Sequence, residues 1–365
     1  MTDATARTFP VPAGLRWSAA TAAFQVEGAR RADGRGPSIW DDFVDTDGLV
    51  KDGSTAEPGP DSYRRSNEDI ALLQGLGVDS YRFSISWVRV QPDGRGPAQP
   101  AGLAYYDRLV DGLLDAGIEP FPTLYHWDLP AVLELSGGWV QPATGSEADQ
   151  SAAHVYDLIH NRLFADPVLT GAYPDLAALG VEMPVHDGDM ELISTASEFY
   201  GINFYNPTTI AAAPEGAPVP FVQVPTPGVA HTGFGELWGI QPHALTTFLT
   251  DAAQRYGDRL PPIIIGENGA SFPEPDEVSG TLADDRRIDY LASHIGAVAD
   301  AVAQGVRVDE YTVWSLLDNF EWADGFAQRF GLVHVDQQTS KRTPKASYEW
   351  YRSLIAEAKS ARARA

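Results

Sequence analysis

The chain alternates strand-like and helix-like stretches along most of its 365 residues. Ser80–Ser86 alternates apolar and polar side chains, as a half-buried strand does. Leu103–Ala116 reads as a helix that directs Leu109, Val110, Leu113 and Leu114 inward, and Gly117 follows where a glycine would end a helix. This alternation predicts a parallel sheet with crossover helices, and the length suits one (β/α) barrel with loop insertions.

The same patterns predict six barrel-type strands instead of the eight of a complete barrel. The expected strands are Leu15–Phe24, Ser80–Ser86, Glu119–Tyr125, Phe199–Tyr205, Pro262–Ile265 and Glu310–Leu317. The expected helices are Asn67–Leu76, Leu103–Ala116, Ala152–Phe164, Ala244–Tyr256, Arg287–Gln304 and Tyr348–Ser360.

The alternation breaks after Trp139. Gln141–Gln150 is small and polar, with no strand expected before the next helix, and the Pro/Gly-rich stretch Asn206–Gly233 is predicted to be irregular. Because the chain has no internal repeat and no low-complexity linker, residues 1–365 are predicted to form a single domain.

Charge and composition exclude several kinds of partner. There are 26 Lys and Arg against 50 Asp and Glu, a net charge of −24, which repels nucleic-acid phosphates and anionic membranes. Zero cysteine excludes disulfides, thiolate metal sites and a cysteine nucleophile. We find neither a secretory signal nor an apolar run of membrane-spanning length, so a cytoplasmic location and a neutral or cationic partner are expected.

Polar and aromatic side chains gather at the ends of the expected strands. Each of these residues alone is explained more simply by packing or helix capping. Together, amides, a histidine, acids and tryptophan faces suit a polyhydroxylated ring, because hydroxyls need donors and acceptors and a sugar's C–H face stacks on indole. The phosphate-loop, dinucleotide, zinc-protease and serine-hydrolase motifs are absent from the sequence, and no metal or other cofactor is expected.

Ordered motifs along nearly the whole chain resemble glycoside hydrolase family 1, the β-glucosidase type. They are AATAAFQVEG at 19–28, GPSIWD at 36–41, YRFSISW at 81–87, YHWDLP at 125–130, ENG at 267–269, VWSLLDNFEW at 313–322, RFGLV at 329–333 and RTPK at 342–345. The resemblance implies a TIM-barrel-like (β/α) barrel and a β-glycoside or another small sugar as the ligand.

The resemblance also implies roles for individual residues. Glu267 matches the nucleophile of a retaining mechanism, which proceeds through a glycosyl-enzyme, and Arg82 and Tyr205 match residues that contact this nucleophile. Trp314 matches the indole platform beneath the sugar. The other residues that match the substrate-binding set are Gln25, His126, Trp127, Asn203, Glu321, Trp322 and Phe326.

One family motif is absent. The Thr-Leu-Asn-Glu-Pro-like segment that carries the acid/base glutamate at the end of the fourth strand does not occur, and the only Asn-Glu pair, Asn67-Glu68, lies in the first helix. The sequence passes from a segment expected after the third strand to one expected after the fifth, with a seam at 140–143, near Gln141. Two strand–helix units are therefore expected to be missing, about 60 residues or more.

This gap leaves three interpretations open. The chain is a β-glucosidase-like hydrolase with impaired activity, a non-catalytic sugar-binding protein, or a barrel adapted to different chemistry in which Glu267 is reused. Near the seam, Glu147, Asp149 and His154 are substitute acids only in principle. The strands beside the gap would lose neighbours, which predicts either direct pairing with each other or homo-oligomers formed through exposed strand edges.

Overall fold

A computed structural model describes residues 11–12, 14–128, 139–276, 278 and 280–364. The described chain forms two compact units, which we treat separately. The middle unit contains residues 139–265 and 292–309, and the N/C unit contains residues 14–128, 266–291 and 310–364. The expectation of a single domain stays a prediction.

The main sheet has six strands in the order β3-β2-β1-β9-β8-β5. The strands are β1 (Arg16–Ala20), β2 (Ser80–Ser84), β3 (Glu119–Thr123), β5 (Tyr200–Asn203), β8 (Ile263–Asn268) and β9 (Val308–Trp314). β1 pairs in parallel with β2 and with β9, and β2 pairs in parallel with β3. The predicted incomplete (β/α) barrel with six strands is confirmed. Both β8 and β9 begin in the middle unit and end in the N/C unit.

Two prolines line the outer edge of β3. Glu119 donates its backbone N–H to Asp79 O at 3.0 Å, so this residue faces β2. Because backbone groups alternate in direction along a parallel strand, Pro120 and Pro122 face away from β2. Proline has no N–H, so this edge offers hydrogen-bond acceptors at these two positions and no donors.

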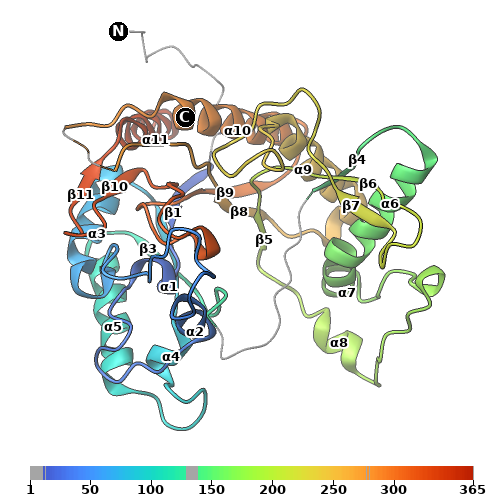
Figure 1. Cartoon of the computed structure of the whole chain (residues 1–365). Coiled ribbons are helices and arrows are strands. Elements are labelled where there is room, and N and C mark those ends of the chain that lie inside the picture. The colour runs from blue at the N-terminus through green and yellow to red at the C-terminus, as the bar shows by residue number, and fades with distance from the viewer. Residues whose placement is uncertain (1–10, 13, 129–138, 277, 279, 365) are drawn as a thin grey trace. The chain divides into compact units, whose positions relative to one another are not determined.

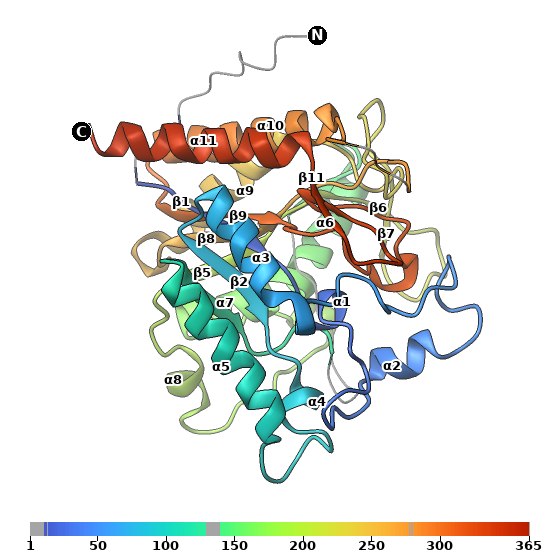
Figure 2. The ribbon, with the colours of Figure 1, turned by 90° about the vertical axis from the view of Figure 1, so that its left-hand side faces the viewer.

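Several helices belong to the N/C unit. They are α1 (Ala23–Val26), α2 (Ile39–Val44), α3 (Ser62–Leu76), α4 (Trp87–Val90), α5 (Pro100–Asp115) and α11 (Ala346–Arg362), with a 3₁₀ turn at Trp322–Asp324 and a hairpin of β10 (Val333–Val335) and β11 (Arg342–Pro344). Helices α3 and α5 lie side by side next to β2 (Figure 2). The helix α10 (Asp285–Ala303) begins in this unit and ends in the middle unit.

The expected apolar helix faces are largely confirmed. Leu73 and Leu76 of α3 and Leu109 and Leu113 of α5 are buried, whereas Leu114, which was expected inward, is 57% exposed. The helix α3 begins five residues before its predicted start, because its first turns are polar and carry no apolar periodicity.

The middle unit contains a second, three-stranded sheet in the order β4-β6-β7. Besides β5 and parts of β8, β9 and α10, the middle unit contains these elements: β4 (Val140–Pro142), α6 (Glu147–Asp157), a π-helical turn (Leu158–Arg162), α7 (Leu163–Thr170), a 3₁₀ turn (Ala177–Leu179), α8 (Asp189–Ile193), β6 (Thr208–Ala212), β7 (Phe221–Gln223), α9 (Pro242–Tyr256) and a 3₁₀ turn (Gly257–Arg259). Helix α6 lies against this sheet (Figure 1).

Two predictions for this unit are wrong. Residues 206–233 are not irregular throughout, because β6 and β7 pair as an antiparallel hairpin within them. A strand, β4, does precede the helix expected at 152–164, and that helix begins at Glu147, where the Ser146 side chain accepts the N–H of Asp149 at 3.1 Å. In the part of the chain that the structure describes, no helix has the length and apolar character needed to cross a membrane.

Candidate functional site

Arg82 and Glu267 meet at the carboxyl ends of two strands of the main sheet. Alternation along β2 buries Tyr81 and Phe83 on one face and points Arg82 to the other. Arg82 Nη1 lies 2.5 Å from Glu267 Oε1, near the end of β8. The Glu267 side chain is 6% exposed, so a nearly buried carboxylate is paired with one guanidinium.

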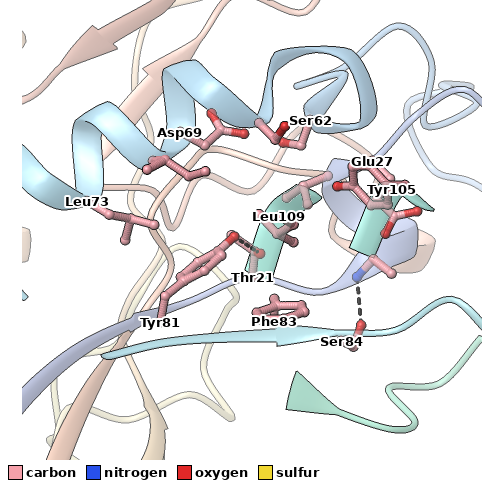
Figure 3. Close-up of a pocket in the computed structure, with 14 residues that line it drawn as sticks. Thr21, Glu27, Ser62, Asp69, Leu73, Tyr81, Phe83, Ser84, Tyr105 and Leu109 are labelled. Atoms are coloured by element: carbon pink, nitrogen blue, oxygen red, sulfur yellow. Dashed lines mark hydrogen bonds between the residues drawn. The ribbon is translucent and has the colours of Figure 1, made fainter. Parts of the chain in front are cut away.

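A small cavity lies on the opposite face of β2. Tyr81 and Phe83 line it together with residues of α3 and α5, and its volume is about 20 Å³ (Figure 3). Thr21 Oγ1 lies 2.5 Å from the Tyr81 hydroxyl beside this space. The volume suits about one water molecule, and because strand alternation directs Arg82 away from the cavity, we place it outside the candidate site.

Three residues predicted to bind substrate are hydrogen-bonded to one another. Gln25, from α1, donates from Nε2 to Glu321 Oε2 at 3.3 Å, and Trp314 donates from Nε1 to Glu321 Oε1 at 3.3 Å. Gln25, Trp314 and Glu321 are each at most 5% exposed. The structure therefore brings together residues that are almost 300 positions apart in the sequence.

Stacked aromatic rings lie beside these polar groups. The His126 ring lies parallel to that of Trp314, with centroids 5.6 Å apart, and to that of Trp322 at 6.1 Å. Trp127 stacks on Trp322 at 5.1 Å. His126 Nδ1 is also 3.9 Å from Glu267 Oε1, so the aromatic faces lie near the paired carboxylate. Flat apolar faces beside carboxylates suit a ring that carries both C–H and hydroxyl groups.

Burial shifts the protonation of two of these residues. Burial, assisted by the nearby Glu267 charge, raises the pKa of Glu321 to about 8, although hydrogen bonds from Trp314 and Gln25 oppose the shift. Burial, assisted by Arg82, lowers the pKa of His126 to about 4 despite the Glu267 carboxylate. His126 is therefore neutral at pH 7, and its proximity to Glu267 is not an ion pair.

Phe326 belongs to an aromatic cluster that supports the site. Its ring packs edge-on against Phe320 at 5.5 Å, and Phe24, Trp40 and Trp322 belong to the same cluster. Phe24 stacks on Trp322 at 6.3 Å. This packing holds the Trp322 indole in place.

Asn203 and Tyr205 lie in the middle unit. Asn203 ends β5, and the Tyr205 ring packs against that of Trp238 with centroids 5.3 Å apart. Their expected contacts with the substrate and with Glu267 stay predictions. Of the acids near the seam, Asp149 accepts the Thr144 hydroxyl at 2.5 Å and the Ala212 N–H at 2.8 Å, which is a structural role within this unit.

A cluster of Glu274, Asp318 and His334 has the donor atoms of a metal site. Lys345 Nζ, however, donates to Glu274 at 2.6 Å and to Asp318 at 2.8 Å. Arg287 also donates to Glu274, at 2.6 Å. The two cations neutralise the acids, so we interpret the cluster as a buried ion-pair network. Sequence analysis did not identify it, although Asp318 and Lys345 lie within two of the quoted motifs.

The fold and the site define an incomplete (β/α)-barrel protein with buried carboxyl groups beside stacked aromatic rings. A sequence profile described as glycosyl hydrolase family 1 matches residues 7–144 and 139–360. The chain belongs to this family of glycosidases.

Known relatives agree with this assignment. The chain is 34% identical to a β-glucosidase of Agrobacterium sp., over 97% of each chain. It resembles the structure of a family 1 β-glucosidase from Thermotoga maritima with a TM-score of 0.86 and 31% identity, covering 95% of this chain and 98% of that one. It resembles virulence factor SghA from Agrobacterium tumefaciens with a TM-score of 0.87 and 34% identity, covering 96% and 98%.

The alignments contain many positions to which this chain contributes no residue. The alignment with the Agrobacterium sp. enzyme has 449 positions and the chain has 365 residues, so at least 449 − 365 = 84 positions have no counterpart here. The two segments that match the family profile meet at residues 139–144. This junction includes Gln141, the position near which the expected succession of family motifs is interrupted.

Proposed function

We propose that this glycosidase acts on β-D-glucosides by a retaining mechanism with Glu267 as the nucleophile. The observation that carries the proposal is the nearly buried Arg82–Glu267 pair beside hydrogen-bonding and indole groups. The names of the relatives support the choice of sugar: several are β-glucosidases, and SghA has been solved with its substrate analogue salicin.

In the proposed first step, a Glu267 carboxylate oxygen attacks the anomeric carbon while the bond to the leaving-group oxygen breaks. The leaving group takes the bonding electron pair, and a covalent glycosyl-enzyme forms. The Arg82 guanidinium fixes the carboxylate by its hydrogen bond and favours its charged form. Tyr205 is proposed to support the same carboxylate.

The remaining residues are proposed to bind the sugar. Amide, imidazole and carboxyl groups would pair with its hydroxyls, and the indole rings would cover its apolar faces. The proposed set is Gln25, His126, Trp127, Asn203, Trp314, Glu321, Trp322 and Phe326.

We further propose that the fourth and fifth strand–helix units are missing at the seam near Gln141, and the acid/base glutamate with them. The junction of the two profile matches and the alignment gap support this proposal. Without a proton donor, the leaving group must depart as an anion, and without a base, no group activates water in the second step. General acid–base assistance contributes about 10²–10⁴-fold, so we expect unactivated glucosides to be cleaved slowly.

The test uses 2,4-dinitrophenyl β-D-glucoside, whose leaving group needs no proton. We expect a burst of one dinitrophenolate per protein followed by slow turnover, and azide should accelerate the turnover by attacking the glycosyl-enzyme. A 2-fluoroglucoside should give a covalent adduct that mass spectrometry locates on Glu267. Both signals should disappear in Glu267→Ala and persist in Glu68→Ala, a change at an exposed carboxylate. An adduct on another residue would refute the nucleophile assignment.

A second candidate function is sugar binding without catalysis. The hydrogen bonds that join Gln25, Trp314 and Glu321 favour it, because they do not involve the missing glutamate. Saturable glucose binding measured by calorimetry, with neither burst nor adduct, would support it. If no β-glucoside interacts at all, both functions fail, and a barrel adapted to different chemistry is left.

A further inference from the structure

A buried amide outside the predicted substrate-binding set contacts Gln25. This residue, Asn319, is 1% exposed and follows β9, between Trp314 and Glu321 in sequence. Its role below rests on the proposed function, because it acts through the interaction between Gln25 and a sugar.

Two neighbours fix the orientation of the Asn319 amide. Its Nδ2 donates to Leu317 O at 3.0 Å and to Ser315 Oγ at 2.9 Å. The Ser315 hydroxyl donates to the same Leu317 carbonyl at 2.7 Å, which leaves its oxygen free to accept from Asn319. Since a backbone carbonyl only accepts, Nδ2 must face Leu317 and Oδ1 must face the other way.

Asn319 Oδ1 in turn fixes the Gln25 amide. Gln25 Nε2 donates to Asn319 Oδ1 at 2.9 Å and to Phe320 O at 2.8 Å. Reversing the Gln25 amide would turn its oxygen toward these two acceptors and toward Glu321 Oε2, so the reversed orientation is strongly disfavoured. The position of Gln25 Oε1 is therefore set by Asn319 and the Phe320 carbonyl together.

This arrangement leaves Gln25 Oε1 buried without a hydrogen-bond partner among the residues that the structure describes. Gln25 as a whole is 1% exposed. A buried acceptor without a partner is unfavourable, and a hydroxyl hydrogen supplied by a ligand would relieve it.

We propose that Asn319 is a positioning residue that holds Gln25 Oε1 toward the sugar as an acceptor, so that the site requires a hydroxyl donor at one position of the ring. A fluorine at that position can accept weakly but cannot donate, so it does not satisfy Oε1. The inference thus concerns the direction of one hydrogen bond to the sugar as well as its presence.

The test compares methyl β-D-glucoside with its 3-, 4- and 6-deoxy and deoxyfluoro analogues by calorimetry. In the wild-type protein, we expect both analogues at one position to bind about ten- to hundred-fold more weakly. Asn319→Leu removes one of the acceptors that hold the Gln25 amide, while the Phe320 carbonyl remains. The amide should then reverse more readily, and the difference between the hydroxyl and fluoro ligands should fall severalfold. Asn161→Leu removes a side-chain amide from the middle unit and should leave this preference unchanged.

Asn319→Asp provides a rescue test. A protonated carboxyl can donate to Leu317 O and accept from Gln25, as the asparagine does, whereas a carboxylate cannot donate. Both forms, however, accept from Gln25 Nε2, so this variant should keep the hydroxyl preference that Asn319→Leu loses, and a defect caused only by lost packing would not show this difference.

Two results would overturn the inference: a wild-type protein that binds deoxyfluoro analogues as well as glucosides, or an Asn319→Leu variant that keeps the wild-type preference. If no glucoside binds the wild-type protein, the proposed function fails and a ligand-free measurement decides the inference. The Gln25 side-chain amide hydrogens should exchange slowly by NMR in the wild type and at least tenfold faster in Asn319→Leu. Equal exchange rates would refute the positioning role.

Discussion

Arg82 and Glu267 form an ion pair in which both side chains are largely removed from water, at 13% and 6% exposure. The two residues come from different strands and lie 185 positions apart in the sequence. Loss of one partner would leave the other charge poorly solvated. Replacing either residue is therefore expected to have a larger effect than replacing a residue of an exposed ion pair.

Arg82→Met should slow the formation of the 2-fluoroglucosyl adduct by about 10- to 100-fold, because a hydrogen bond to a charged group contributes about 1.5–3 kcal/mol. Mass spectrometry over time gives the rate. Arg64→Met, which removes an ion pair whose arginine is 57% exposed, is the matched control and should label like the wild type. Equal rates in the wild-type protein and Arg82→Met would contradict a supporting role for Arg82.

Glu321→Gln should stabilise the protein progressively as the pH rises from 5 to 8. The pKa of Glu321 is about 8 in the folded protein and has its ordinary value of 4.5 when unfolded. Between these values the unfolded chain releases a proton that the folded chain keeps, so the free energy of unfolding falls as the pH rises. Glutamine does not titrate and avoids this loss.

Thermal melts of both proteins across this range test the Glu321 prediction. The difference in Tm should grow with pH and level off above pH 8. Burial also raises the pKa of Asp128 to about 7, and Asp128→Asn separates its contribution. A Tm difference that does not vary with pH would show that Glu321 keeps an ordinary pKa.

Lys345→Met should destabilise the protein by about 3–5 kcal/mol, because it leaves Asp318 and Glu274 buried with too little positive charge. Urea unfolding measures the change. The control, Lys51→Met, removes an ion pair to Asp324 whose lysine is 70% exposed, and should cost at most about 1 kcal/mol. Similar losses in the two variants would argue against the ion-pair network as a source of stability.

The sequence predicted those parts of the site that follow from strand periodicity and motif order. Alternation in Ser80–Ser86 predicted that Arg82 lies on the opposite face of the strand from Tyr81 and Phe83. Glu267 stood out because it follows an apolar strand. Motif order also indicated the seam near Gln141, and six strands were expected and found.

Other features depend on contacts that sequence periodicity does not encode. The hairpin of β6 and β7 was missed because proline and glycine dominate the segment, although Thr208–Ala212 is rich in β-branched residues. The role of Asn319 depends on the orientations of the Asn319 and Gln25 side-chain amides. Those orientations follow from hydrogen bonds to the Leu317 and Phe320 carbonyls, which the sequence does not reveal.

The edge of β3 leads to a fourth prediction. Replacing Pro120 and Pro122 with valine restores two outward N–H groups and raises strand propensity. We expect the double variant to form larger assemblies at concentrations where the wild type does not, measured by light scattering. Phe121→Val, at the intervening position, adds no donor and is the control. If the double variant scatters like the wild type, the prolines do not protect this edge.

The prolines also bear on the expectation that strand edges mediate self-association. An approaching strand needs complementary donors and acceptors in alternation, and at Pro120 and Pro122 it would find only carbonyl oxygens. Addition of a further strand to the sheet is therefore disfavoured at β3. A sheet whose order ends at β3 can in this way avoid offering that edge as a template for fibril formation.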